Sequence, residues 1–243
     1  MSVVRLKENP LALGFYTASE AAKLVQFSST AKVYAWLRGW PNRQIGPVLK
    51  RQYVPVHNME ELSFLDLMEV RFVRYFREQK VGWRTLHAAA AEARKELKTD
   101  HPFASNKIFA TDGKRIYLVD LLRRGAESAD DERAMDLITK QYEIYEAIKA
   151  SLVKGVEFDP RTHMADRWYP RPEKFPAIII DPKIAYGRPA TSLKGVPTEA
   201  LYDAWKAEEE DFSLVAEWFE LPIRDVRQAV NFHRTVFHAE NSH

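Results

Sequence analysis

The chain contains no cysteine and only nine glycines among its 243 residues. The lack of cysteine excludes disulfide bonds, thiolate metal sites and cysteine nucleophiles. The glycines form none of the patterns GxGxxG, GxSxG or GxxxxGK followed by Ser or Thr, which dinucleotide-binding, nucleophile-elbow and P-loop sites require. We therefore expect a protein that is not an enzyme, with no catalytic residues and no cofactor.

Long apolar runs are also missing. No run approaches the roughly 20 residues of a membrane-spanning helix, and the N-terminus lacks the apolar segment of a signal peptide. The seven histidines are scattered. His233 and His238 are five residues apart, which differs from the i, i+4 spacing of a helical zinc pair. We expect a cytoplasmic protein that binds neither metal nor membrane.

Charge is divided unevenly along the chain, although the net charge is only +2. Residues 1–98 hold 16 Lys and Arg against 9 Asp and Glu, whereas the remainder holds 20 against 25. A basic segment is typical of proteins that bind the phosphate backbone of nucleic acid, which repels an acidic segment. The two halves are therefore expected to meet different partners.

Residues 15–38, FYTASEAAKLVQFSSTAKVYAWLR, have the sequence pattern of a helix-turn-helix. Thr17 and Glu20 are spaced as a capping box at the start of the first helix. A second helix, capped within residues 28–30, turns Val33, Trp36 and Leu37 inward. Lys32, Tyr34 and Arg38 are then left outside. The alternative is an ordinary helical hairpin within a core.

Basic residues continue just after this motif. Residues 45–55, IGPVLKRQYVP, alternate enough to predict a short hairpin tipped by Lys50 and Arg51. Such a hairpin after a helix-turn-helix is a wing, whose cations contact phosphates or the minor groove.

The middle of the chain alternates between helical and strand patterns. Helices are predicted over residues 62–79 and 83–97, with the arginines of the first on its solvated surface. Residues 108–119 predict a β-hairpin around Asp112-Gly113, followed by a polar loop over 123–131. An apolar stripe over residues 138–152 predicts a further helix, which belongs either to the core or to a dimer seam.

The C-terminal part has a buried-strand pattern over residues 177–180. Helices are predicted near 198–207, 212–219 and 223–237, and the last two are spaced as a second small helix-turn-helix. Acidic residues, among them the run 208–211, surround this second motif, so we expect it to contact protein and not DNA. The fold class is mainly α with small β-hairpins (α+β).

These segments divide the chain into three regions. Residues 1–100 form the predicted winged helix-turn-helix domain. Residues 101–172 form an α+β connecting region with a short hairpin near 156–169. A proline-rich stretch then leads into residues 173–243, the C-terminal helical domain.

Two groups of motifs resemble known families. YTASEAAKLV, SSTAKVYAW and SFLDLMEVRFVRYFREQKVGW, with the basic wing, resemble the MerR-type winged helix. AIIIDPKIAYGRPAT, GVPTEAL and VAEWFELPIRDVRQAVNF resemble a small domain of unknown function that occurs in VapB-type antitoxins. With TDHPFAS, TDG and DRWYP between them, residues 15–232 resemble antitoxins that join such a head to such a tail.

The resemblance implies a type II antitoxin, which binds its own operator and neutralises a co-expressed toxin, typically a PIN-domain ribonuclease. It places Gln26 where the turn often has glycine, and it does not extend to the cysteine ligands of metal-sensing MerR proteins. The start and end of the recognition helix and the wing are carried over by position. The candidate DNA-binding residues are Ser28, Ser29, Thr30, Lys32, Tyr34, Arg38, Arg43, Lys50 and Arg51.

The partners expected are duplex DNA, the toxin and a second copy of the chain, since paired half-sites increase affinity. Aromatic side chains are enriched at interfaces, so Tyr202, Trp205, Trp218 and Phe232 are the candidate toxin contacts. One alternative is a MerR-like regulator that binds an effector near Tyr142, Tyr145 and Trp168. Another is an adaptor that does not contact DNA.

Overall fold

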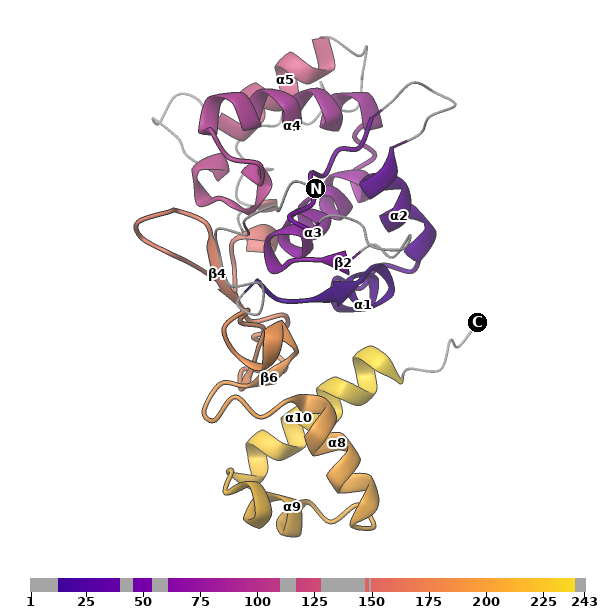
Figure 1. The fold of residues 1–243 in the computed structure, drawn as a ribbon, viewed down its shortest axis with the longest axis vertical. Helices are drawn as coiled ribbons and strands as arrows, with labels where there is room; N and C mark the ends of the chain where they lie inside the picture. The colour runs from indigo at the N-terminus through magenta and orange to yellow at the C-terminus, as the bar shows by residue number, and fades with distance from the viewer. Residues whose placement is uncertain are drawn as a thin grey trace, which may run out of the picture. The chain divides into compact units, whose positions relative to one another are not determined.

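A computed structural model describes residues 13–39, 46–53, 61–109, 117–127, 147, 148 and 150–238. The fold is mainly helical, with small two-stranded sheets, and it divides into two compact units (Figure 1). The larger unit is Thr17–Ala165, and the smaller unit combines Met1–Tyr16 with Asp166–His243. The boundary therefore falls at residue 165, and residues 101–165 group with the N-terminal helices. Within the described part, no helix is long and apolar enough to cross a membrane.

The larger unit begins with two short helices that pack on two longer ones. β1 (Tyr16–Thr17) pairs with β2 (Glu61–Leu62), and α1 (Ala18–Leu24) is followed by α2 (Thr30–Arg38). α3 (Phe64–Glu78) and α4 (Trp83–Leu97) lie where the apolar periodicity predicts helices. Ser63 begins α3 with a capping box in which its hydroxyl accepts from the Asp66 N–H.

The arginines of α3 were predicted to lie on its solvated surface, and Arg77 is exposed there, whereas Arg71 and Arg74 are half-buried. All three guanidinium groups donate to backbone carbonyls. Arg71 donates to Ser151 O at 2.6 Å and to Leu152 O at 2.9 Å. Arg77 donates to Val81 O, at the turn between α3 and α4. Each guanidinium supplies a donor that the nearby helix end or turn lacks.

The predicted hairpin over residues 108–119 is wrong. η3 (Pro102–Ala104) and η4 (Asn106–Phe109) are 3-10 turns, and α5 (Tyr117–Glu127) is a helix that replaces both the second strand and much of the predicted polar loop. Leu118, Leu121 and Leu122 are buried at helical spacing, and this stripe outweighs the local turn signal. The turn itself lies outside the described residues.

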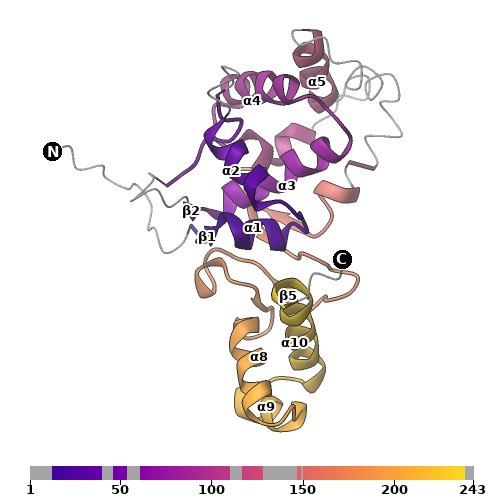
Figure 2. The same cartoon turned by 90° about the vertical axis from the view of Figure 1, so that its right-hand side faces the viewer.

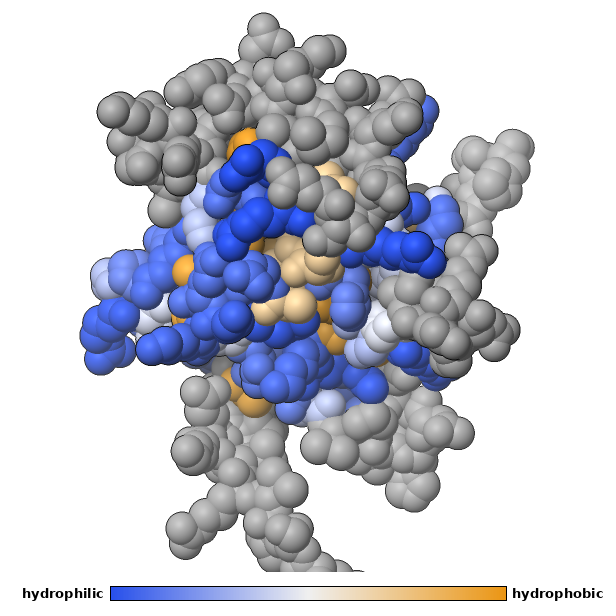
Figure 3. Space-filling model, turned by 90° about the horizontal axis from the view of Figure 1, so that it is seen from above, coloured by the Kyte–Doolittle hydropathy of each residue, from blue (hydrophilic) through white to orange (hydrophobic). Residues whose placement is uncertain are grey.

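α5 packs closely along α4, and Figures 1 and 2 show the two helices side by side. Gly125 makes this approach possible, because a Cβ atom built there would lie 2.7 Å from Thr85 O of α4. Most of the residues that are coloured in Figure 3 are hydrophilic, and hydrophobic ones show in a small area near the centre of the view. Of the predicted helix over 138–152, the described residues 147, 148 and 150–152 are helical.

The smaller unit combines short strands with three helices. β3 (Val156–Phe158) pairs with β4 (Ala165–Trp168), as predicted for a short hairpin near residues 156–169. β5 (Ile178–Ile179) pairs antiparallel with β6 (Ala190–Thr191), and the turn η5 (Ala185–Gly187) lies between them. Tyr16, the first residue of β1, groups with this unit, and its hydroxyl donates to Gly187 O at 2.7 Å.

The three C-terminal helices have the predicted bounds: α8 is Thr198–Ala207, α9 is Phe212–Phe219 and α10 is Ile223–Phe237. α10 packs on both of the others, and it runs beside α8 in Figures 1 and 2. Asp211 caps α9 by accepting from Ser213 N–H at 2.7 Å and from Leu214 N–H at 3.1 Å. The core between the helices holds Leu201, Val226 and Val230, with 0% exposure each.

Candidate nucleic-acid interface

The first helix of the predicted helix-turn-helix begins as the sequence indicates. Thr17 Oγ1 accepts from the Glu20 N–H at 3.1 Å, and the Glu20 carboxylate accepts from the Thr17 N–H at 2.8 Å. The turn passes through Gln26 at φ 57, a left-handed conformation that glycine adopts at lower cost. The glycine-like position of the turn is therefore present, although glutamine occupies it.

The second helix is fixed by its inner face. Ser29 is the N-cap, and its hydroxyl accepts from the Lys32 N–H at 3.3 Å. Val33, Trp36 and Leu37 are buried as predicted. The Trp36 ring stacks on Phe27 with centroids 5.0 Å apart and on Trp83 of α4 at 6.4 Å. These contacts hold the turn and α2 against the helical scaffold.

The end of α1 is tied to the scaffold by a residue that sequence reasoning missed. Arg74 of α3 donates to Val25 O, the carbonyl of the C-cap residue of α1. The same guanidinium donates to Glu78 at 2.8 Å, which fixes its direction. The sequence indicates only that Arg74 lies on a less buried helix face, and it does not indicate which carbonyl the side chain contacts.

The outer face of α2 presents the predicted cations. Lys32 and Arg38 are exposed near the two ends of the helix, about 9 Å apart along its axis at 1.5 Å per residue. Lys32 Nζ lies 5.7 Å from the Phe27 ring centroid, and the Arg38 guanidinium lies 5.1 Å from that of Tyr34. Phe27 and Tyr34 therefore support the cations from within the motif.

The polar residues predicted to contact DNA gather at the start of α2. Ser28 is exposed, and Ser29 and Thr30 are half-buried around the cap. The amide groups of the first helical turn have no partner within the helix, so a helix start of this kind can meet a phosphate oxygen. The structure thus brings together Ser28, Ser29, Thr30 and Lys32. Arg43 lies outside the described residues.

The predicted wing is not a hairpin in its described part, because residues 46–53 form bends without strands. Val48 and Leu49 are buried, and Leu49 N–H donates to Trp36 O of α2 at 3.5 Å. Lys50 is exposed but pairs with Asp100 at 2.7 Å, and Arg51 is half-buried. The segment therefore packs against α2, whereas the predicted wing would project from the domain.

Asp66 of α3 anchors this segment, and it belongs to a group of three buried ionisable side chains. Asp66 Oδ2 accepts from the Gln52 N–H at 3.3 Å and from the Ser63 N–H at 2.8 Å. His101 Nδ1 lies 3.4 Å from Asp66 Oδ1 and 3.5 Å from Glu69 Oε2. We call these residues the Asp66–Glu69–His101 cluster. All three are at most 5% exposed.

The pKa values of Asp66 and His101 are both raised. Burial raises the pKa of Asp66, and the neighbouring Glu69 charge adds to the rise, against the opposing effects of His101 and the Ser63 N–H. Burial lowers the pKa of His101, but a hydrogen bond with Glu69 and the charges of both carboxylates outweigh it and raise the pKa above its usual value. Both shifts favour the protonated form of the group concerned. Within the described residues, no group of three or more His, Asp or Glu is arranged to hold a metal ion.

The predicted toxin contacts separate into core and surface residues. Phe232 is 0% exposed, and its ring meets Phe175 edge to face at 5.5 Å. Trp205 is 4% exposed, and its indole N–H donates to Glu210 O at 2.7 Å. Both are core residues, which corrects their assignment as toxin contacts. Their side chains lie on the apolar helix faces that pack in the core between the helices. Tyr202 is half-buried, whereas Trp218 is 58% exposed.

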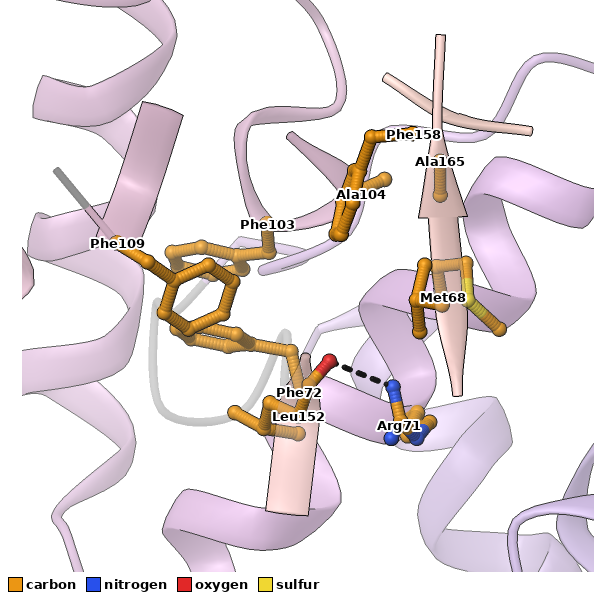
Figure 4. Close-up of a pocket in the computed structure, with 10 residues that line it drawn as sticks. Met68, Arg71, Phe72, Phe103, Ala104, Phe109, Leu152, Phe158 and Ala165 are labelled. Carbon is orange, nitrogen blue, oxygen red and sulfur yellow. Dashed lines mark hydrogen bonds between the residues drawn. The ribbon is translucent and has the colours of Figure 1, made fainter. Parts of the chain in front are cut away.

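The predicted effector pocket is not formed by the described residues. Trp168 is 3% exposed within the core, and Tyr142 and Tyr145 lie outside the described residues. A separate apolar cavity lies between α3, η3 and the strand residues of the larger unit, lined among others by Met68, Phe72 and Phe103 (Figure 4). Its volume of about 10 Å³ gives room for about one water molecule.

Comparison with known proteins shows a shared fold and identifies no family. No protein-family model matches the chain, and no curated protein sequence matches it. Among solved structures, it is similar to the X-ray crystal structure of Rv2018 from Mycobacterium tuberculosis. The TM-score is 0.65 at 21% sequence identity, over 92% of this chain and 98% of that one. At this identity the similarity shows a shared fold alone.

Proposed function

We propose that this chain is a DNA-binding antitoxin of a type II toxin–antitoxin system, which represses its own operon. The observation that carries the DNA-binding part is α2: a capped helix, fixed on its inner face by Trp36, with Lys32 and Arg38 on its outer face. The antitoxin part is supported by the resemblance of the head and tail motifs to VapB-type antitoxins.

In this proposal α1 and α2 form the DNA-binding motif of the N-terminal domain, and the start of α2 enters the major groove. Ser28 and the first amide groups of α2 contact phosphate, while Lys32 and Arg38 add positive charge at the two ends of the helix. The segment over residues 46–53 takes the place of a wing beside α2. A symmetric dimer then contacts two half-sites one helical turn apart.

The C-terminal domain is assigned to the toxin, a PIN-domain ribonuclease in the family that the motifs resemble. Trp218 is the aromatic contact that this assignment favours, because its side chain is 58% exposed on α9. Exposed tryptophans are frequent anchors of protein interfaces.

DNA binding is tested by fluorescence anisotropy with duplex DNA from the region upstream of the chain's own gene. We expect Lys32→Ala to lower the log-log salt slope by about 0.9 and the affinity roughly eightfold at 0.1 M salt, because one phosphate contact is lost. Lys107→Ala, which removes an exposed lysine from η4, serves as the control and should leave both unchanged. Equal affinities for the wild type and Lys32→Ala would refute the assignment of α2.

Antitoxin activity is tested by growth. The adjacent open reading frame is induced alone and then together with this chain. Growth arrest followed by rescue is the expected result. Normal growth under both conditions would contradict the antitoxin part and leave the DNA-binding part to stand on the anisotropy result.

The alternative, a MerR-like regulator that responds to an effector, has less support. The apolar cavity of the larger unit gives room for about one water molecule, and of the predicted effector contacts only Trp168 lies in the described part, where it is buried. A small molecule that shifts the melting temperature or the DNA affinity would favour this alternative.

A further inference from the structure

α10 of the smaller unit has two faces of opposite character. Val226, Ala229, Val230 and His233 point into the core. The opposite face carries side chains that line a groove of about 640 Å³. The residues of α10 in this groove are Ile223, Arg224, Arg227, Gln228, Asn231, Arg234 and Thr235. At 100° per residue, those from Arg224 to Thr235 fall within about 120° of the helix circumference.

The groove is basic although the C-terminal part of the chain is acidic. Lys174 joins Arg224, Arg227 and Arg234, and none of the nine residues that line the groove is acidic. The acidic run over residues 208–211 forms the connection between α8 and α9 and does not line the groove. The prediction that the C-terminal part does not contact DNA relied on its summed charge, whereas the fold places its acidic run and its basic groove on different surfaces.

The acidic side chains that approach this surface leave most of its charge in place. Asp225 is 5% exposed and lies 3.3 Å from the Arg224 Nε, but the Arg224 side chain itself is 80% exposed. The Arg227 guanidinium lies 5.0 Å from the Phe212 ring centroid, which supports it from α9. The Arg234 Nη2 donates to Asn231 Oδ1 at 3.0 Å, so the two polar groups hold each other in position.

α9 and α10 have the connectivity of a helix-turn-helix whose second helix is exposed. α9 ends at Phe219, its C-cap Glu220 takes a left-handed conformation at φ 49, and Pro222 is the N-cap of α10. The outward residues of α10 are arginine, asparagine and glutamine, the types whose forked side chains pair with guanine and adenine edges in the major groove. Arg224 to Arg234 span about 15 Å, or roughly four base pairs of duplex DNA.

From this charge and geometry we propose that α10 is a second DNA-reading helix, which binds duplex DNA in the major groove. Arg224 and Arg227 contact phosphates or guanine, and Asn231 contacts a base edge. Gln228 has a structural duty as well, because its Oε1 accepts from the Ala177 N–H at 3.0 Å at the start of the β5 strand region. The chain then carries two DNA-binding elements, one in each unit.

The proposal is tested with the full chain and a mixed-sequence DNA duplex in anisotropy measurements over a range of salt concentrations. We expect Arg224→Gln with Arg227→Gln to lower the log-log salt slope by about two and the affinity at least tenfold. Arg188→Gln is the matched control, because Arg188 is an exposed arginine of the same unit that pairs with Glu199 at 2.6 Å outside the groove. Circular dichroism confirms that each variant is folded.

Two further variants separate base reading from charge. Arg227→Lys keeps the charge but lacks the planar fork, so it should retain the slope and lose affinity for the preferred sequence. Asn231→Ala should relax sequence preference in a selection from random duplexes while leaving the slope unchanged.

The outcomes distinguish this proposal from the assignment of α2. If the double arginine variant keeps the wild-type affinity and slope while Lys32→Ala loses them, α10 is not a DNA-binding element and α2 is. If the arginine variant alone weakens binding, α10 stands and the α2 assignment falls. A groove that instead prefers duplex RNA of the same sequence, or a loss of toxin capture with DNA binding intact, would overturn the assignment to DNA.

Discussion

The Asp66–Glu69–His101 cluster gives the structure a stability that depends on pH in a defined direction. His101→Gln keeps a polar side chain but removes the cation that faces two carboxylates with 0% exposure each. Removing one partner of a buried ion pair costs about 3–5 kcal/mol, because the remaining charge stays desolvated. We expect the variant to lose about 3 kcal/mol of unfolding free energy near pH 6.

The loss should shrink as the pH rises. The pKa of His101 is raised in the folded state, because Glu69 and Asp66 outweigh the opposing effect of burial. The stabilisation is therefore complete below the unfolded pKa of about 6.5 and disappears as the pH rises through the higher folded pKa. The raised pKa of Asp66 has the same sign, but this residue is present in both proteins. The gap between wild type and variant should narrow as the pH rises above the unfolded pKa of about 6.5.

Urea unfolding at a series of pH values measures this gap. His87→Gln is the matched control, because burial and the neighbouring Arg94 lower the pKa of His87. The stabilisation that His87 contributes is present above its unfolded pKa and is lost as the pH falls, so the stability difference between wild type and His87→Gln should widen as the pH rises. A gap for His101→Gln that stays constant, or that widens with pH, would refute the assigned role of the cluster.

Two packing contrasts test the fold in the same assay. Gly125→Ala places a methyl group 2.7 Å from the Thr85 carbonyl oxygen and should destabilise the protein by about 1–3 kcal/mol. Gly46→Ala is the control, because its new methyl group meets the nearest atom at 3.5 Å and should change stability by less than about 0.5 kcal/mol. Equal effects of the two substitutions would contradict the close approach of α5 to α4. Trp205→Ala should lower the free energy of unfolding by about 3–5 kcal/mol because the side chain is buried, whereas Trp218→Ala, at an exposed position, should change it by at most about 0.5 kcal/mol. The reverse order would contradict the packing described for α8 and α9.

The sequence predicts elements well where the apolar periodicity is strong or where a capping box marks the start of a helix. α8, α9 and α10 have the predicted bounds, and the capping box of Thr17 and Glu20 begins α1 as expected. It fails at residues 108–119, where Asp112-Gly113 is a strong local turn signal. There the buried stripe through Leu118 and Leu122 forms a helix because it packs on α4, a partner that local rules do not see.

The candidate site is predicted less completely than the fold. Lys32 and Arg38 are placed by helical spacing, which is local. Arg74, in contrast, meets Val25 across 49 positions of sequence, and composition gives no hint of this contact. The basic groove of α10 was missed because net charge was counted along the sequence, whereas the fold places its acidic and basic residues on different surfaces.

DNase footprinting of the region upstream of the chain's own gene tests DNA binding by this protein most directly. With full-length protein, we expect a protected segment that disappears in the Lys32→Ala, Arg38→Ala double variant and persists in Lys107→Ala. Complete cleavage at every protein concentration, or protection that the double variant retains, would contradict operator binding through α2.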